Sequence, residues 1–523
     1  MEKNPSKVMF DRRSHLLFER PCAPPSHHGH CVPEATPPSL RTRTGWSLLA
    51  QGAPAIAAAA CVPILTRALG PERFGILLLV WTIFGMAGVA DLGIGRSLTQ
   101  LVATRRSQKD ASDLRGVAGI GIAAAVVIGF TGGLMLMLMA SSPPTYLGLV
   151  PDFSGEARRT AILLGAVFPM LVVSSALRGV LEGFERFDLS ALVRITIGVL
   201  TFAGPALLVP ITRRVDAAMG LLLMVRLLGL LALAVMVIRV LPKAHCPITR
   251  RRKILSEILA FGGWTTVSNV VSGAMVYADR FVIGSVISAS AVAFYTVPSE
   301  IVTRLLLAPI AIGTVWLPAF ASSTRTDTRA VLDLSERGLR LLLASLVPPL
   351  VAATALAEPL LRIWAGPEFT VTGVSVLRWL ALGVLFNGVA QIPFAFLFAI
   401  GRPKLVATLH LLELPLYVAL LAWALPTYGI VGAGMAWAAR SALDAAALFA
   451  ATAALGQRSL VILSVGIGGL LILAAAGLSS VTNPLMAATF ISFLSLLWAW
   501  IALLTPAWRN EIRAGAVRIF GRR

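Results

Sequence analysis

The stretch AAMGLLLMVRLLGLLALAVMVI, residues 217–238, contains a single charged side chain, Arg226, in 22 residues. At about 1.5 Å per residue, a helix of this length crosses the ~30 Å hydrocarbon layer of a membrane. Arginines lie on both sides of it, at Arg213, Arg214 and Arg239. The stretch therefore predicts a transmembrane helix, and the same pattern recurs along the chain.

The whole composition agrees with a membrane protein. Hydrophobic residues make up 57% of the 523 residues, charged ones only 13%, and the mean hydropathy is +0.82. This balance lies far outside that of soluble domains. Apolar runs long enough to span a membrane predict an all-α integral membrane protein with about 14 transmembrane helices. The predicted spans are 45–69, 74–103, 114–140, 158–183, 188–210, 215–240, 254–287, 290–321, 333–357, 372–400, 404–425, 430–455, 459–478 and 484–506.

The basic residues crowd into alternate gaps between these runs. With the N-terminus placed inside, 33 of the 45 Lys and Arg fall in inward gaps and eight in outward ones. Short cytoplasmic segments carry an excess of Lys and Arg. The distribution predicts a multi-pass protein of the cytoplasmic membrane with both termini cytoplasmic.

The net charge of +20 follows mostly from this topology, and no nucleic-acid partner is predicted. A short N-terminal stretch holds Cys22, His27, His28, His30 and Cys31, which could suggest a metal site. No apolar run is available there to fold around a metal, so a disordered tail is the better interpretation. No metal and no cofactor are predicted.

The chain divides into two similar halves. Gly45-Trp46 opens the first half after basic residues, and Gly263-Trp264 opens the second in the same way. Internal repeats of this kind are common in secondary transporters, which bind substrate between the repeats. The predicted organisation is a disordered cytoplasmic tail 1–44, a six-helix bundle 45–240, a basic linker 241–253, a second six-helix bundle 254–455, two additional helices 456–506 and a basic tail 507–523.

A set of motifs in a fixed order carries a family resemblance. The motifs are Pro63–Gly75, Asp91–Gly95, Asp279–Arg280, Phe294–Tyr295, Trp316–Phe320, Glu358–Phe369, Gly401–Pro403 and Gly429–Ala433. With them the chain resembles the polysaccharide or lipid-linked oligosaccharide flippases of the multidrug/oligosaccharidyl-lipid/polysaccharide exporter superfamily, over residues 45 to 506. The resemblance implies two pseudo-symmetric six-helix bundles around a central cavity, and alternating access that carries a polyprenyl-diphosphate-linked glycan outward. The long N-terminal tail departs from the family pattern.

Arginines inside the predicted helices are the first candidates for substrate binding. Ionisable groups at membrane depth are costly unless they are paired or hydrated, and guanidinium groups bind phosphate oxygens in a bidentate manner. The substrate-binding candidates are Arg280, Arg304 and Arg440, with the acidic neighbours Asp279 and Glu300. No catalytic residue is predicted.

A purely structural interpretation stays open for these residues. Glu300 and Arg304 are four residues apart, as are Arg440 and Asp444, so each pair can neutralise itself along one helix face. Neighbouring residues in a helix point about 100° apart. Asp279 and Arg280 therefore cannot share a face, and we expect one to point to the cavity and the other to a helix partner.

Asp91 and Glu413 are the ion-coupling candidates, because secondary transporters use buried carboxylates to bind H⁺ or Na⁺. Asp91 lies near Gly93, which leaves open a role as a cap at a helix break. Glu413 precedes Pro415, a possible kink in its helix. His410 is interpreted as a packed polar residue.

The sequence thus predicts a non-enzymatic flippase for surface polysaccharide assembly, with a lipid-linked glycan and membrane lipids as ligands. H⁺ or Na⁺ are candidate coupling ions, and a polysaccharide polymerase and glycosyltransferases are candidate partners. Two alternatives remain: an ion-coupled drug or small-molecule antiporter of the same superfamily, and a membrane-embedded polysaccharide polymerase or ligase. The longest outward gap, 141–157, holds only Asp152 and Glu156 as acidic residues, which argues against the enzymes.

Overall fold

A computed structural model of the chain consists of α-helices and short 3-10 turns throughout its described residues. These residues are 40–86, 91, 93–107, 111–141, 154–241, 275–307, 328–400 and 402–453, with the isolated positions 254, 256, 273 and 309. The basic linker, the two predicted C-terminal spans, the C-terminal tail and residues 1–39 lie outside them. So does the Trp316–Phe320 motif.

The first half forms one group of helices whose limits lie close to the predicted spans. Each of its long helices is almost uniformly apolar, as the hydrocarbon layer requires. α1 begins five residues before the predicted start at 45, so residues 40–44 are helical rather than part of the predicted disordered tail. The helices are α1 (Leu40–Gly85), α3 (Ile94–Ser107), α4 (Ala111–Ser141), α5 (Ser154–Gly183), α6 (Phe187–Thr212) and α7 (Val215–Val240).

The second predicted span, 74–103, is not one continuous helix. α1 ends at Gly85, and α3 begins at Ile94 after a turn. Gly93 in this turn has a φ of 72°, which an L side chain rarely adopts. Apolar composition does not detect a break made by backbone geometry, whereas the interpretation of Asp91 as a cap at a helix break agrees with this turn.

The second half forms another group. The segment 275–286 is helical, and α9 ends at Thr303 in a 3-10 turn, after which residues 307 and 309 are again helical. The remainder of the predicted span to 321 lies outside the described residues. Most of the residues after this turn and before α11 lie outside the described part. The elements of this group are α9 (Ala289–Thr303), η4 (Arg304–Leu306), α11 (Thr328–Ala355), α12 (Ala357–Trp364), η5 (Pro367–Phe369), α13 (Thr370–Ala399) and α14 (Pro403–Ala453).

The helix α1 contains two arms that fold back on each other. Its backbone leaves the helical conformation at Gly70, where φ is 71°. Ala58 and Thr82 lie twelve residues before and after this turn and line the same cavity. The two arms therefore run antiparallel and correspond to the first predicted span and the beginning of the second.

The helix α14 repeats this arrangement in the second half. Its non-helical residue is Gly429, with φ of 58° and ψ of −146°. Tyr417, from the arm before the turn, lies 5.5 Å from the guanidinium carbon of Arg440 in the arm after it, measured to the ring centroid. We call this element the α14 hairpin. It unites the predicted spans 404–425 and 430–455.

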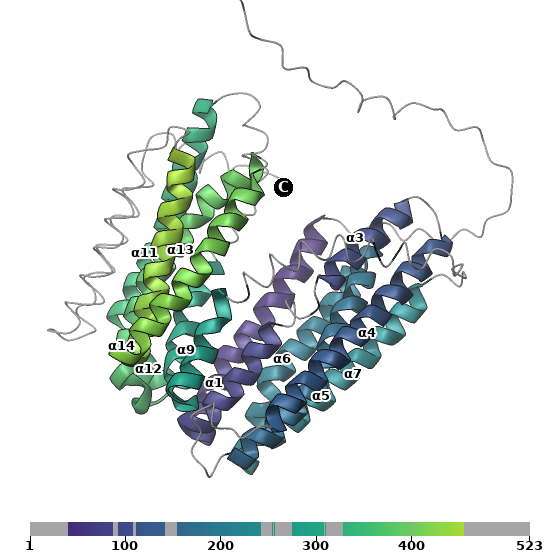
Figure 1. Ribbon diagram of the computed structural model, residues 1–523, viewed down its shortest axis with the longest axis horizontal. Helices are drawn as coiled ribbons and strands as arrows, with labels where there is room; N and C mark the ends of the chain where they lie inside the picture. Colours follow the sequence, from purple (N-terminus) through teal and green to yellow (C-terminus); the bar gives the residue numbers. More distant parts are fainter. Residues whose placement is uncertain are drawn as a thin grey trace, which may run out of the picture.

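The two groups of helices meet mainly through α1 and α9 (Figure 1). From this meeting place the first group, α1 and α3 to α7, and the second group, α9 and α11 to α14, spread apart toward the other end of the molecule. The largest apolar cluster joins them, because Leu65 and Phe74 of α1 pack with Val292 and Tyr295 of α9. α1 is thus the element of the first group that is attached to the second.

Large apolar side chains cover the outside of the helices. Phe130, Leu134, Met135 and Leu138 of α4 are all more than half exposed, as lipid-facing residues are expected to be. In the described part, eight helices are long and apolar enough to cross a membrane, and two of them are the folded-back α1 and α14. The protein is therefore a multi-pass membrane protein, while the count of fourteen spans stays a prediction.

Candidate functional site

A cavity of about 420 Å³ lies where the two groups of helices meet. Both arms of α1 form one wall with small residues such as Ala55, Ala58 and Ala59, which leave room beside the backbone. Residues from α6, the segment 275–286, α9, η4 and α12 form the rest. Four aromatic residues contribute to the walls, namely Trp81, Phe202, Tyr277 and Trp364.

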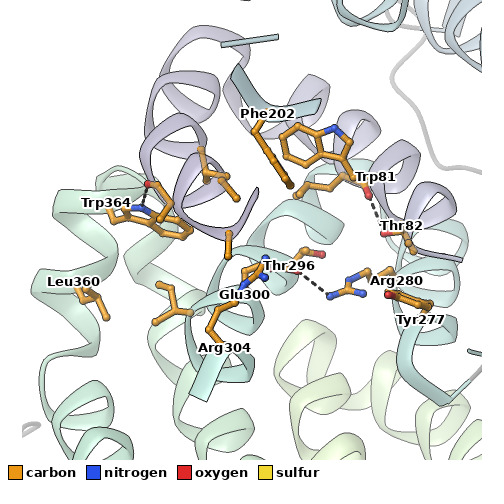
Figure 2. Close-up of a pocket in the computed structure, with 17 residues that line it drawn as sticks. Trp81, Thr82, Phe202, Tyr277, Arg280, Thr296, Glu300, Arg304, Leu360 and Trp364 are labelled. Carbon is orange, nitrogen blue, oxygen red and sulfur yellow. Dashed lines mark hydrogen bonds and ion pairs between the residues drawn. The ribbon is translucent and has the colours of Figure 1, made fainter. Parts of the chain in front are cut away.

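Three charged residues of the second group project into this cavity (Figure 2). Glu300 bridges two arginines: its Oε1 lies 3.5 Å from Nη2 of Arg280, and its Oε2 lies 2.6 Å from Nη2 of Arg304. We call these three residues the cavity cluster. Its formal charge is +1. The side chain of Arg280 is 9% exposed, whereas those of Glu300 and Arg304 are 35% and 47% exposed.

Several donors around this cavity have no acceptor among the described residues. They are Nε of Arg280, Nε1 of Trp81 and Oγ1 of Thr296. The guanidinium of Arg280 lies over the ring of Tyr277, 5.4 Å from its centroid. Buried donors are costly when unpaired, but these three atoms have almost no accessible surface, so a ligand's acceptor oxygens or ordered water reach them only when the side chains move.

Asp279 and Arg280 point to different surroundings, as their helical offset predicts. Asp279 accepts a hydrogen bond of 2.6 Å from the hydroxyl of Tyr295 and does not line the cavity. Tyr295 is 1% exposed and belongs to the core of the second group. Asp279 therefore fixes the segment 275–286 against α9, and this contact helps to hold Arg280 at the cavity wall.

Two side-chain hydrogen bonds join α1 to α12 beside the cavity. Nε1 of Trp364 donates a hydrogen bond of 2.8 Å to the carbonyl oxygen of Ala59. An Nη2 of Arg67 donates a hydrogen bond of 3.2 Å to the carbonyl oxygen of Ile363. Both contacts lie toward the end of the molecule where α1 turns back, and both join the two groups of helices.

Arg440 does not line this cavity. It belongs to a separate set of charged residues within the α14 hairpin. Its Nη1 lies 4.0 Å from Oε2 of Glu413 in the opposite arm. Nε2 of His410 lies 3.5 Å from Oδ1 of Asp444. We call His410, Glu413, Arg440 and Asp444 the hairpin cluster. Instead of the predicted pair of Arg440 with Asp444, the contacts run across the two arms, from Arg440 to Glu413 and from His410 to Asp444, which sequence spacing alone does not reveal.

Asp91, the other ion-coupling candidate, lies far from both clusters along the chain and caps α3. Its Oδ1 accepts a hydrogen bond of 2.9 Å from the backbone N–H of Gly93, and its Oδ2 accepts one of 3.3 Å from Gly95. The hydroxyl of Ser175 donates a further bond of 2.5 Å. A carboxylate is favourable at a helix N-terminus, so these bonds account for Asp91 structurally.

Sequence reasoning missed the neutral members of these sites. Tyr295 was noted only as part of a motif, and Tyr277, Thr296 and Tyr417 were not singled out. One signal was available for Tyr417: it and Arg440 lie at nearly equal distances from Gly429, and a turn there brings them together. No sequence signal pairs Tyr277 with α1.

Comparisons with known proteins agree with this geometry. Residues 40–324 match the family model described as polysaccharide biosynthesis protein. A relative from Shigella flexneri, named "Putative O-antigen transporter", is 29% identical over 411 residues, which cover 78% of this chain and 96% of the relative.

Solved structures show the same fold at low sequence identity. The lipid II flippase MurJ in an inward closed conformation is 14% identical with a TM-score of 0.65, covering 90% of this chain and all of MurJ. An inward-facing multidrug resistance transporter of the MATE family and the MOP superfamily is 16% identical with a TM-score of 0.63, covering 82% of this chain and 95% of its own. The family match spans more than half of the chain, and the chain therefore belongs to the polysaccharide biosynthesis protein family.

Proposed function

We propose that this protein is a flippase that moves a polyprenyl-diphosphate-linked oligosaccharide across the cytoplasmic membrane by alternating access, for surface polysaccharide assembly. Family membership and the Shigella relative support this proposal. The observation that carries it is a cavity with a net positive cluster, two arginines and one glutamate, between two groups of membrane helices. We propose no catalytic step, because the task is to carry a polar head group past hydrocarbon.

The physical problem concerns the head group. A diphosphate with sugars cannot enter hydrocarbon, since unpaired charges and unsatisfied hydroxyls are costly there. The prenyl tail has no such difficulty and stays in lipid. A cavity that offers cationic and neutral donors lowers the barrier for the head group alone.

The cavity cluster is our proposed binding site for the diphosphate. Arg280 is held by Glu300 and Tyr277 and provides a fixed charge with a free Nε–H. Arg304 is about half exposed and can turn toward a ligand. Guanidinium groups stay charged in such sites and match phosphate oxygens in geometry. Of the substrate-binding candidates, we assign Arg440 and Asp279 supporting roles outside the cavity.

Alternating access requires contacts that open on one side while others close. The contacts of α1 with α12, through Trp364 and Arg67, are our candidates for the gate at the end where α1 turns at Gly70. The distribution of Lys and Arg predicts that this end faces outward. With the termini on the cytoplasmic side, opening this gate releases the head group on the outer side.

A polymerase or ligase would need catalytic acidic residues on the outer side, and the described acidic residue of the predicted outward gap has a different role. Glu156 pairs with Arg73 at 3.0 Å and accepts a hydrogen bond from the backbone of Val215, so its carboxylate is used in packing. A polymerase and glycosyltransferases are then proposed as partners that supply and consume the glycan.

Reconstitution tests the proposal directly. Purified protein in liposomes should accelerate the transbilayer movement of a fluorescent polyprenyl-diphosphate oligosaccharide over that in empty liposomes. Movement at the rate of empty liposomes would reject the flippase activity. A fluorescent phosphatidylglycerol in the same liposomes is the control, and its equal acceleration would indicate a non-selective scramblase instead.

The antiporter alternative keeps one specific observation in its favour, because Glu300 lies in an aromatic cavity that could accept an organic cation. The same liposomes loaded with a cationic dye distinguish the two functions. We expect no protein-dependent dye efflux under an imposed pH or sodium gradient. Efflux without glycolipid movement would support the antiporter.

Arg304 offers a matched test of the site. Arg304→Ala should slow glycolipid movement by about tenfold, since a partly exposed charge–phosphate contact contributes on the order of 1.4 kcal/mol. Arg362→Ala is the control: Arg362 forms an equivalent pair with Glu358, at 2.7 Å and four residues apart, but lies outside the cavity lining. Equal effects of the two changes would contradict the site.

A further inference from the structure

The hairpin cluster is a buried set of charges that the proposed binding of the glycolipid does not use. The turn at Gly429 brings His410 and Glu413 of one arm against Arg440 and Asp444 of the other. One possible ligand atom from each of His410, Glu413 and Asp444 lies within 4.8 Å of the others. The set therefore belongs to one compact polar site between two membrane-spanning arms.

This site is enclosed by protein. Glu413 is 8% exposed and Asp444 5%, while the neighbours Leu411 and Leu412 are more than half exposed on the outer face. Neither oxygen of Glu413 accepts a hydrogen bond from any described residue. A carboxylate in this situation is costly when ionised unless a cation is bound nearby.

The charges within the cluster leave room for one more positive charge. Glu413 and Asp444 bring two negative charges when both are ionised, and Arg440 brings one positive charge. His410 contributes a charge only when protonated. One proton, shared among His410 and the two carboxylates, therefore makes the cluster neutral. Two carboxylates that share a buried site bind a proton more readily than either would alone.

A divalent metal ion fits this site less well than a proton. Its three possible ligands come with Arg440, whose guanidinium already lies 4.0 Å from Glu413. A dication at the same place would be repelled by that fixed charge. Arg440 is itself held by the faces of Tyr417 and Trp437, with its guanidinium carbon 5.5 Å and 5.8 Å from the ring centroids.

Aromatic side chains surround the charges of the hairpin cluster. Tyr417, on the same arm as Glu413, is fully buried, and its ring centroid lies 5.5 Å from the guanidinium carbon of Arg440. Tyr295 of α9, the other fully buried tyrosine, donates its hydroxyl to Asp279. From α13, Phe394 stacks on His410 and brings no charge. The negative charge of the two carboxylates is therefore balanced within the cluster itself.

We propose that the hairpin cluster is a proton-binding site, in which His410, Glu413 and Asp444 hold one exchangeable proton and Arg440 is the fixed counter-charge. His410, with a side chain 23% exposed, is the member through which the proton enters. The proton moves between water, the His410 imidazole and a carboxylate oxygen, with no other reactant. Its arrival removes the excess negative charge beside Arg440, and this change of charge inside the α14 hairpin is the coupling step of the proposal.

Infrared spectroscopy tests the site without any substrate. The purified full-length protein in nanodiscs is titrated with acid, and the carboxylic C=O band that grows is recorded in difference spectra. We expect one band from a buried carboxyl in the wild type, and its loss in both Glu413→Gln and Asp444→Asn. Glu358→Gln, which changes an exposed ion-paired carboxylate, should leave that band unchanged.

Two results would overturn the proposal. If the spectra of Glu413→Gln and Asp444→Asn both keep every titrating band of the wild type, the cluster binds no proton in the accessible pH range. Loss of the band on addition of Na⁺, Mg²⁺ or Zn²⁺ at constant pH would show that the site binds that cation. The second variant keeps the test decisive if the first does not fold.

The transport consequence rests on the proposed flippase function and is measured separately. In liposomes with an imposed pH gradient, glycolipid movement by the wild type should depend on the gradient, and movement by Glu413→Gln should not. If neither the wild type nor any variant moves glycolipid, the flippase proposal fails. The infrared result still shows whether the hairpin cluster binds a proton. A gradient dependence that persists in Glu413→Gln would reject the coupling role of the cluster.

Discussion

Two arginine–glutamate clusters lie in the second group of helices, and they differ in how far they are enclosed. In the cavity cluster, Glu300 and Arg304 are 35% and 47% exposed and only Arg280 is buried. In the hairpin cluster, Glu413 and Arg440 have side chains 10% and 8% exposed. The same pair of residue types thus occurs once at an open wall and once between two packed helix arms.

The difference in enclosure decides what each cluster can bind. A large anion can reach the cavity cluster, because Arg304 is free to leave Glu300 and the cavity provides about 420 Å³. The hairpin cluster lies between two packed arms, with the side chains of Glu413 and Arg440 both about nine-tenths buried, and suits an occupant as small as a proton. Equivalent chemistry therefore produces a ligand site in one place and a charge switch in the other.

The largest expected effect is on transport, and it should distinguish Arg280 from Arg440, the buried arginine of the other cluster. Arg280→Gln should slow glycolipid movement about 100-fold, since removing a buried charge that contacts its ligand costs roughly 2.7 kcal/mol or more. Arg280→Lys should recover part of this rate because it restores the charge without the planar fork. The measurement is the initial rate in liposomes at equal protein content.

Arg440→Gln is the matched change in the hairpin cluster. It should alter the dependence of transport on pH while leaving the binding of a polyprenyl diphosphate within about twofold of the wild type. Equal losses of binding in Arg280→Gln and Arg440→Gln would mean that both arginines contact the head group, and the comparison between the clusters would fail.

A smaller effect with the opposite sign is expected for Glu300→Gln. Glu300 competes with the ligand for both arginines of the cavity cluster. Its neutralisation should tighten the binding of a fluorescent polyprenyl diphosphate by about tenfold, because like charges near a ligand cost on the order of 1.4 kcal/mol or more. Glu358→Gln provides the control, and weaker binding by Glu300→Gln would contradict the assigned role.

The last comparison is measured as stability rather than transport and concerns the turn that builds the hairpin cluster. Gly429→Ala should lower the free energy of unfolding by about 1–3 kcal/mol, because Gly429 holds a backbone conformation that L side chains rarely adopt. Gly220→Ala is the control, since a Cβ meets nothing within 4 Å at either position and only Gly429 has a positive φ. Thermal unfolding in nanodiscs measures the difference; equal stability of the two variants would contradict it.

Helix limits could be predicted from the sequence where hydropathy alone decides them. The predicted span 215–240 coincides with α7, and 188–210 differs from α6 by one or two residues. The break between Gly85 and Ile94 could not be predicted from composition, because it depends on Gly93 and on hydrogen bonds to Asp91. Hydropathy measures transfer into lipid and carries no information on backbone dihedrals.

The candidate residues could also be found from the sequence, but their grouping could not. Charges at membrane depth are rare enough to identify Arg280, Arg304, Arg440 and Glu413 individually. Arg280 and Glu300 come from different helical segments, and Glu413 and Arg440 from opposite arms of a hairpin. Sequence spacing gives neighbours only within one helix.

The sequence by itself therefore determined that this is a helical membrane protein of many spans, and which of its charged residues lie within those spans. Those properties follow from the transfer of side chains into lipid, which each segment undergoes independently. Only the tertiary structure decided that one arginine pair faces a cavity while Arg440 is enclosed in the α14 hairpin. That choice depends on contacts between segments, and in particular on the turns at Gly70 and Gly429, which set the residues that meet.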